Sequence, residues 1–158
     1  MSKVVRDFIE DTLRKVRDDV SFSYARESDF NAIQNKTYPA VLLKPLSFTP
    51  KRVGYTINRE YKVTLLFYAL DSLEGAEDET KEILDEVDEL VTSFLAVLNL
   101  RSLSVDDDPE EDVTSDKITI SNEEVIPRIK FTSDNVTGYQ LDFVLEVPDH
   151  KDYCEIYD

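Results

Sequence analysis

The chain has 158 residues, a usual length for one domain, and 41% of them are hydrophobic, which suits a globular protein and not a disordered chain. Its 34 acidic residues outnumber its 18 basic residues and give a formal charge of −16 at pH 7. A surface this acidic repels phosphates at long range, so a protein that reads DNA or RNA sequence is disfavoured.

Two segments repeat apolar residues with helical spacing. Near the start of the chain these residues recur every three or four positions, which predicts an amphipathic helix over about residues 3–19. The same spacing in the second half predicts a helix over about residues 79–98, and Asp78 is suited to cap its first turn.

The segment between the two helices is predicted to form two strands. Residues 39–46 are mainly apolar, and Pro45 places this strand near an edge or breaks it. Residues 55–68 alternate polar and apolar side chains, as a half-buried strand does, and one end is expected to continue as an arm beyond the sheet. We interpret residues 22–37 as a loop or a weak strand, and residues 47–54 as a connection.

Two further strands are predicted after the second helix. Residues 118–131 favour one strand that is bent or bulged around residues 125–127. Residues 139–147 alternate most regularly and predict the last strand. An acidic loop at residues 101–116 precedes these strands, and an acidic tail at residues 149–158 follows them.

The predicted order is therefore helix, strand, strand, helix, strand, strand, in a single domain that covers residues 1–158. Hairpin-connected strands and amphipathic helices in this order favour an α+β fold. We expect a four-stranded, mainly antiparallel sheet with both helices packed on one face. The sequence shows no internal repeat and no low-complexity linker that would mark a second domain.

The residue types that usually carry catalysis or bind metals form no recognisable site. A catalytic triad needs a base, and the only histidine, His150, lies in the charged tail, where its orientation would be poorly defined. His150 and Cys154 supply two ligands at most, whereas a structural zinc site usually takes four. The lone Cys154 also excludes an internal disulfide. We therefore expect no catalytic, cofactor-binding or metal-binding residues, and no enzymatic activity.

The acidic loop is the remaining candidate for a cation site. It places Asp106, Asp107 and Asp108 close to three more acids, a run that can attract calcium or magnesium weakly. The run lacks the glycine and the alternating oxygen ligands of a calcium loop. The three glycines of the chain are isolated, so no phosphate-binding loop is predicted either. We interpret the acidic loop as a solvated surface loop.

The start of the chain and its apolar runs bear on localisation. Charged residues such as Lys3, Arg6 and Asp7 lie close behind Met1, and no apolar signal-peptide core follows them. No apolar stretch reaches the roughly 20 residues that a membrane helix needs. We therefore expect a protein that is made in the cytoplasm and does not enter a membrane.

Charge is unevenly distributed along the chain. Residues 71–90 contain ten acids and one base, whereas residues 36–62 contain six bases and one acid. Each run can be a solvated surface, but opposite charges on two segments of one chain also suit faces that meet between copies or partners. The candidate interface residues are Lys51, Arg52, Arg59 and Lys62 in the basic run, Glu79, Glu82 and Glu86 in the acidic run, and Asp106, Asp107 and Asp108 in the acidic loop.

Three segments, with the leading helix and the acidic helix around them, form a pattern found in one family of virion proteins. They are FNAIQNKTYPAVLLKPL at residues 30–46, YTINREYKVTLLFYALD at residues 55–71, and IKFTSDNVTGYQLDFVLEVPD at residues 129–149. In this layout the chain resembles the tail-terminator and head–tail joining proteins of tailed bacteriophages. The pattern covers nearly the whole chain, and its motifs are short and degenerate.

The resemblance implies a ring in the virion, commonly of six subunits and alternatively of twelve, that caps the tail tube or joins it to the neck. Its partners would be further copies of the chain and neighbouring neck, portal-adaptor or tail-tube proteins. DNA would only pass through the lumen, and no catalytic residues or cofactors are implied. The unusually acidic loop and the acidic tail depart from the family pattern.

Two other classes of function stay open. One is a small acidic adaptor or DNA-mimic inhibitor, which would bind a basic partner as a monomer or dimer and release it as salt rises. The other is an enzyme that works with carboxylates and tyrosines alone. Loss of activity on changing one buried pair of such residues would reveal it.

Overall fold

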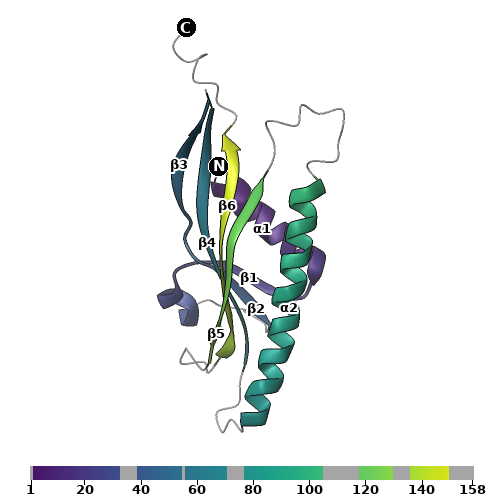
Figure 1. Cartoon of the computed structure of the whole chain (residues 1–158). Coiled ribbons are helices and arrows are strands. Elements are labelled where there is room, and N and C mark those ends of the chain that lie inside the picture. Colours follow the sequence, from purple (N-terminus) through teal and green to yellow (C-terminus); the bar gives the residue numbers. More distant parts are fainter. Residues whose placement is uncertain are drawn as a thin grey trace.

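The computed structural model describes residues 2–32, 39–54, 56–70, 77–104, 118–129 and 136–149. Two α-helices, one 3-10 helix and six strands occupy these residues, which makes the protein an α+β fold (Figure 1). In chain order they are α1 (Ser2–Val16), β1 (Ser21–Tyr24), η1 (Glu27–Ala32), β2 (Ala40–Leu43), β3 (Ser47–Val53), β4 (Thr56–Leu70), α2 (Glu77–Ser104), β5 (Thr119–Arg128) and β6 (Val136–Asp149).

One mixed sheet contains all six described strands. The strands pair in the order β1-β2-β4-β6-β5, and β3 also pairs with β4. The pair β1–β2 is parallel, and the other pairs are antiparallel. The longest ladder joins β4 to β6 through 14 residue pairs, from Ile57 opposite Asp149 to Leu70 opposite Val136. This ladder runs the full height of the sheet in Figure 1.

Strands β2 and β3 share one edge of β4. The register shifts by one residue between the pair Leu43–Leu65 and the pair Ser47–Lys62, on either side of Pro45. Proline has no amide hydrogen, so it cannot continue the ladder and the edge divides into two strands. We call the outer part of this hairpin, residues 47–53 together with 56–62, the arm.

The predictions of a four-stranded sheet and of its element order are wrong. Strand β1 lies in the segment interpreted as a loop or a weak strand, and β3 replaces the predicted connection at residues 47–54. Strand β3 contains Pro50, and its described side chains are exposed on both faces. An exposed edge strand needs no apolar row, so the alternation that marks a half-buried strand is missing there.

Strand β5 is bulged, but not at the predicted position. The register shifts between Ser121 and Glu124, and Asn122 has a φ of 57°. Asparagine tolerates this left-handed conformation better than most residues, because its short polar side chain can bond locally. Residues 125–127, where the bulge was predicted, continue the ladder with β6. Pro127 is tolerated there because β5 is an edge strand.

Both helices pack on the same face of the sheet. The core there combines alternate residues of β4 and β6, such as Leu65, Phe67 and Leu141, with Ile9 of α1 and Phe94 of α2. The rings of Phe67 and Phe94 lie 5.5 Å apart. Each large apolar side chain buried in this way contributes about 1.5–3 kcal/mol to folding. The opposite face carries a smaller apolar cluster (Ala40, Leu42, Leu66, Tyr68 and Val136).

Helix α1 is fixed against the C-terminal end of α2 by Arg101. Its Nη1 donates hydrogen bonds to Thr12 Oγ1 at 2.8 Å and to the carbonyl oxygen of Phe8 at 3.2 Å. The guanidinium also lies over the Phe8 ring, 4.4 Å from its centroid.

The N-terminal half of α2 extends beyond α1 (Figure 1). None of the helices in the described part of the chain is both long and apolar enough to cross a membrane.

Gly138 is required by the closeness of β4 and β6. A Cβ at this position would lie 1.7 Å from the carbonyl oxygen of Phe67, in the backbone of the neighbouring strand. We expect Gly138→Ala to lower the free energy of unfolding by about 3 kcal/mol, measured by urea denaturation. The matched control is Gly54→Ala, where nothing lies within 4 Å and the φ of +62° alone should cost about 1 kcal/mol. Equal effects of the two substitutions would contradict this account of the ladder.

Candidate interaction surfaces

The described residues hold no cluster of three or more His, Cys, Asp or Glu side chains placed to bind a metal ion. A depression of about 260 Å³ on α1 is lined by Asp7, Glu10, Asp11 and Arg14, which all come from one helix. His150, Cys154, Asp106, Asp107 and Asp108 lie outside the described residues. The candidate site is therefore sought on the surfaces that carry the remaining predicted residues.

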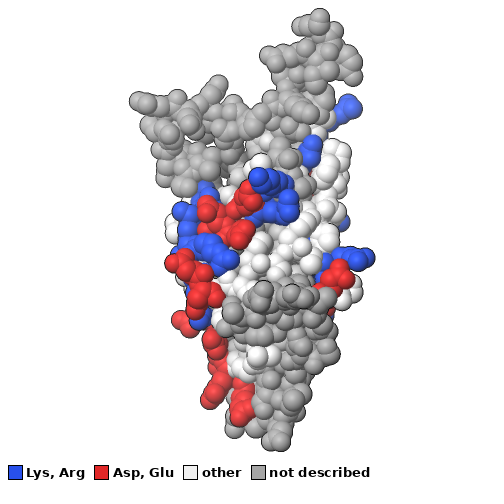
Figure 2. Space-filling view, turned by 180° about the vertical axis from the view of Figure 1, so that it is seen from behind, with Lys and Arg blue, Asp and Glu red and all other residues white. Residues whose placement is uncertain are grey.

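An acidic stripe follows the N-terminal half of α2. Glu79, Glu82 and Glu86 are exposed, and Glu89 is exposed in line with them. Their spacing of three, four and three residues places them on one flank of the helix over about 15 Å. We call these four residues the acidic stripe. Acidic side chains line the lower left of Figure 2, where α2 lies.

Two further acids, Asp85 and Asp88, are exposed on the N-terminal half of α2. Asp85 and Asp88 lie close enough to Tyr139 of β6 to affect its ionisation. Burial raises the pKa of Tyr139, and the negative charges of Asp88 and Asp85 raise the pKa further, because both disfavour a phenolate. Asp88 lies apart from the acidic stripe, whereas Asp85 borders it, because Asp85 is three residues from Glu82 and four from Glu89.

The face of the arm that points to the helix side of the sheet is aromatic and basic. Phe48 is 46% exposed, and its ring lies 5.4 Å from that of the buried Tyr61. The guanidinium of Arg59 lies over the Phe48 ring at 4.5 Å, and its Nη1 donates to Tyr61 Oη at 3.5 Å. Arg52 is exposed and faces the same side, because it pairs with Ile57. We call Phe48, Arg52 and Arg59 the arm face.

The opposite face of the arm is nearly neutral. Lys51 Nζ lies 3.4 Å from a carboxylate oxygen of Glu146 and 3.5 Å from one of Glu60. Both acids raise the pKa of Lys51, Glu146 more strongly than Glu60. Asn58 Nδ2 donates to the other oxygen of Glu146 at 2.8 Å. Lys62 is exposed on this face as well. The four predicted bases are thus divided between two faces, with Arg52 and Arg59 on one and Lys51 and Lys62 on the other.

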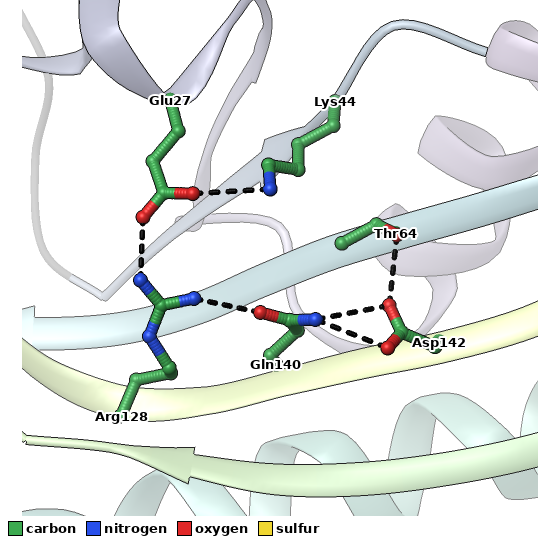
Figure 3. A network of polar contacts seen from close by, with 6 residues as sticks. All are labelled: Glu27, Lys44, Thr64, Arg128, Gln140 and Asp142. Atoms are coloured by element: carbon green, nitrogen blue, oxygen red, sulfur yellow. Dashed lines mark hydrogen bonds and ion pairs between the residues drawn. The ribbon is translucent and has the colours of Figure 1, made fainter.

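A polar network continues along that same face of the sheet (Figure 3). Glu27 of η1 pairs with Lys44 at 3.0 Å and with Arg128 of β5 at 2.5 Å. Arg128 Nη1 donates to Gln140 Oε1 at 2.7 Å. Further contacts join Gln140 and Thr64 to Asp142, at 3.0 Å and 2.8 Å. The network connects η1, the end of β2, β4, β5 and β6.

Sequence reasoning missed this network. Glu27 and Arg128 are 101 residues apart and become neighbours only through the fold. The one available signal was the pair of polar residues Gln140 and Asp142 on the outward-facing positions of a regular strand. The network ties Glu27 of η1 to the sheet through ion pairs and hydrogen bonds, so we assign it a structural role.

The arm face and the acidic stripe do not meet within one molecule. The arm lies at the top of the molecule in Figure 1, and the N-terminal half of α2 lies at the bottom.

No protein-family model matches this chain, and no curated protein matches it. The resemblance to tail-terminator and head–tail joining proteins therefore stays a prediction, and the function is inferred from the surfaces.

Glu27 should stabilise the fold in a pH-dependent way. Burial raises its pKa, but hydrogen bonds and charge from Lys44 and Arg128 outweigh burial and leave the pKa below its ordinary value. A depressed folded-state pKa stabilises the protein above the unfolded-state pKa, and the contribution is lost as pH falls through the folded-state pKa. We expect Glu27→Gln to lower the free energy of unfolding at pH 7 by about 1 kcal/mol, and the deficit to shrink below about pH 4.

The control for this prediction is Asp29→Asn. Asp29 pairs with Arg26 at 3.0 Å, but both side chains are well exposed, so the change should cost less than about 0.5 kcal/mol at any pH. Urea denaturation between pH 3 and pH 7 measures both variants. A deficit of Glu27→Gln that stays constant over this range would contradict the role given to the Glu27 carboxylate.

Proposed function

We propose that the protein is a non-enzymatic structural subunit of a bacteriophage neck or tail ring, either a tail terminator or a head–tail connector that joins the tail to the head. The observation that carries this proposal is the presence of two surfaces of opposite charge, the arm face and the acidic stripe, at opposite ends of the folded molecule. Different surfaces that fit each other favour head-to-tail contacts between identical subunits, and such contacts close into rings when the rotation between copies allows it.

The architecture supports this role. The arm is built on the β4–β6 ladder, so it projects as part of the sheet and not as an isolated loop. An arm held in this way can reach a neighbouring subunit without a large entropic cost of ordering. The layout of the helices and of the long hairpin also resembles the tail-terminator and joining proteins in the segments quoted above.

The charge suits a channel through which DNA passes. With a formal charge of −16 per copy, a ring of six would surround its lumen with strongly acidic subunits. Such a lumen repels phosphates and keeps DNA from binding to the wall.

The proposed partners are further copies of this chain, with six expected and twelve as the alternative, and neighbouring neck, portal-adaptor or tail-tube proteins. The proposed location is the virion.

The mass of the native protein tests this proposal. Six copies of an 18.2 kDa chain have a mass of about 109 kDa, since six times 18.2 is 109.2. We expect native mass spectrometry and light scattering, over a wide range of protein concentration, to find a discrete species of six copies or of twelve.

A monomer at every concentration would contradict self-assembly of the ring. If that monomer also bound a basic protein in a salt-sensitive way, an acidic adaptor or DNA mimic would be the better assignment. A mixture of sizes that grows continuously with concentration would indicate aggregation and would likewise count against a closed ring.

A further inference from the structure

We infer that the arm face of one copy docks on the acidic stripe of α2 in a second copy. The inference rests on the proposed function, because it names the contact that would hold the ring together. It commits to one occupant for the exposed flank of α2, a second copy of this chain, on the ground of charge complementarity between two surfaces that the fold keeps apart.

The composition of the arm face suits an interface. Aromatic residues and arginine are enriched at protein interfaces, and here an exposed Phe48 lies beneath the guanidinium of Arg59 with Arg52 beside it. None of the described side chains on this face of β3 and β4 is acidic. The planar guanidinium of arginine donates two parallel hydrogen bonds to a carboxylate, which a lysine cannot do.

The acidic stripe offers a matching surface. Four exposed carboxylates lie along about 15 Å of one helix flank, which is long enough to receive Arg52 together with Phe48. The half-buried Ile83 lies in line with Glu79 and Glu86, at helical spacings of four and three residues. Phe48 can therefore pack on Ile83 and on the methylene groups of the glutamates while the Arg52 guanidinium binds a carboxylate.

The opposite face of the arm does not fit as well. Lys51 already pairs with Glu60 and Glu146, so an approaching acidic helix would meet two carboxylates there. Lys62 is the other cation on that face. The contact is therefore assigned to the face that carries Arg52 and not to the face that carries Lys62.

The contact is heterologous, because it joins two different surfaces. Each copy supplies one arm and receives one arm, so every copy takes part in two contacts. This arrangement propagates from copy to copy, unlike a two-fold dimer, in which one patch meets itself.

Charge reversal on the arm tests the inference from one side. We expect Arg52→Glu to raise the concentration for half-assembly about ten-fold or more, because a carboxylate would then meet the acidic stripe. The matched control is Lys62→Glu, which makes the same change of charge in the same hairpin but on the opposite face, and which should assemble like the wild type. Thermal unfolding of each variant checks that the fold is retained.

Charge reversal on α2 tests it from the other side. The double variant Glu82→Lys with Glu86→Lys should lose assembly to a similar extent. Its control is Asp88→Lys, which reverses a charge on the same turns of the helix but apart from the acidic stripe, near Tyr139. This control should retain assembly.

Mixing the two assembly-defective variants is the decisive step. Arg52→Glu keeps an intact acidic stripe, and the Glu82→Lys, Glu86→Lys variant keeps an intact arm face. The two proteins should therefore form complexes with each other at concentrations where neither assembles alone, as measured by native mass spectrometry. Rescue also requires that both variants be folded, so a variant that merely failed to fold would be recognised.

The outcomes separate the inference from the proposed function. A wild type that assembles while all four variants assemble equally well, or while the controls fail as badly as the test variants, overturns this contact and leaves the ring intact. Failure of the mixture to assemble also overturns the contact. A wild type that never assembles contradicts the ring and the contact together.

Discussion

The antiparallel ladder between β4 and β6 is the interaction on which the rest of the structure depends. Its 14 residue pairs place alternate side chains on the two faces of the sheet, so one face receives both helices and the other combines the smaller apolar cluster with polar side chains. Gly138 lets the two backbones approach as closely as they do. Because β6 continues beside the arm as far as Asp149, the arm is supported on both sides of β4, by β3 and by β6. The ladder thus links the core to the surface that we assign to assembly.

The register of the same ladder determines on which face of the sheet each charged side chain lies. On the face away from the helices, acids and bases form ion pairs with one another, in the network around Glu27 and in the group around Lys51. On the helix-side face, the arm presents Phe48, Arg52 and Arg59, and α2 presents its acids at the far end of the molecule. Ion pairs between exposed side chains contribute little to stability, about 0–1 kcal/mol each, so charges that are segregated in this way matter more for recognition than for folding.

The sequence predicted the elements whose periodicity reports burial. Both helices and β6 were recognised because one side of each faces the core, and β4 was recognised for the same reason. Strand β3 was not recognised, because an exposed edge strand has no apolar row, and the short β1 overlaps a segment for which both a loop and a weak strand were predicted. Strand β5 was predicted, but its bulge was placed at the wrong residues. Pro127 suggested a bulge around residues 125–127, whereas the bulge lies between Ser121 and Glu124, where Asn122 has a positive φ.

The candidate site was predictable only as a distribution of charge. The runs of acids and bases marked α2 and the arm, but the face of each basic residue depends on strand register, and a shift of one residue reverses every side chain. Lys51 and Arg52 are neighbours in the sequence and point to opposite faces for this reason. Phe48 gave no signal of its own, because the residues around it are exposed and show no alternation of polar and apolar side chains. The network around Glu27 joins residues from distant segments, and only the fold brings them together.

Negative-stain electron microscopy of the purified protein, at a concentration where it is assembled, tests the central claim most directly. A head-to-tail subunit with one arm and one receiving helix should give closed, hollow rings whose class averages show a single rotational symmetry, with six or twelve equivalent copies. Compact two-fold dimers, or single molecules at every concentration, would contradict the claim that this protein assembles through two different surfaces.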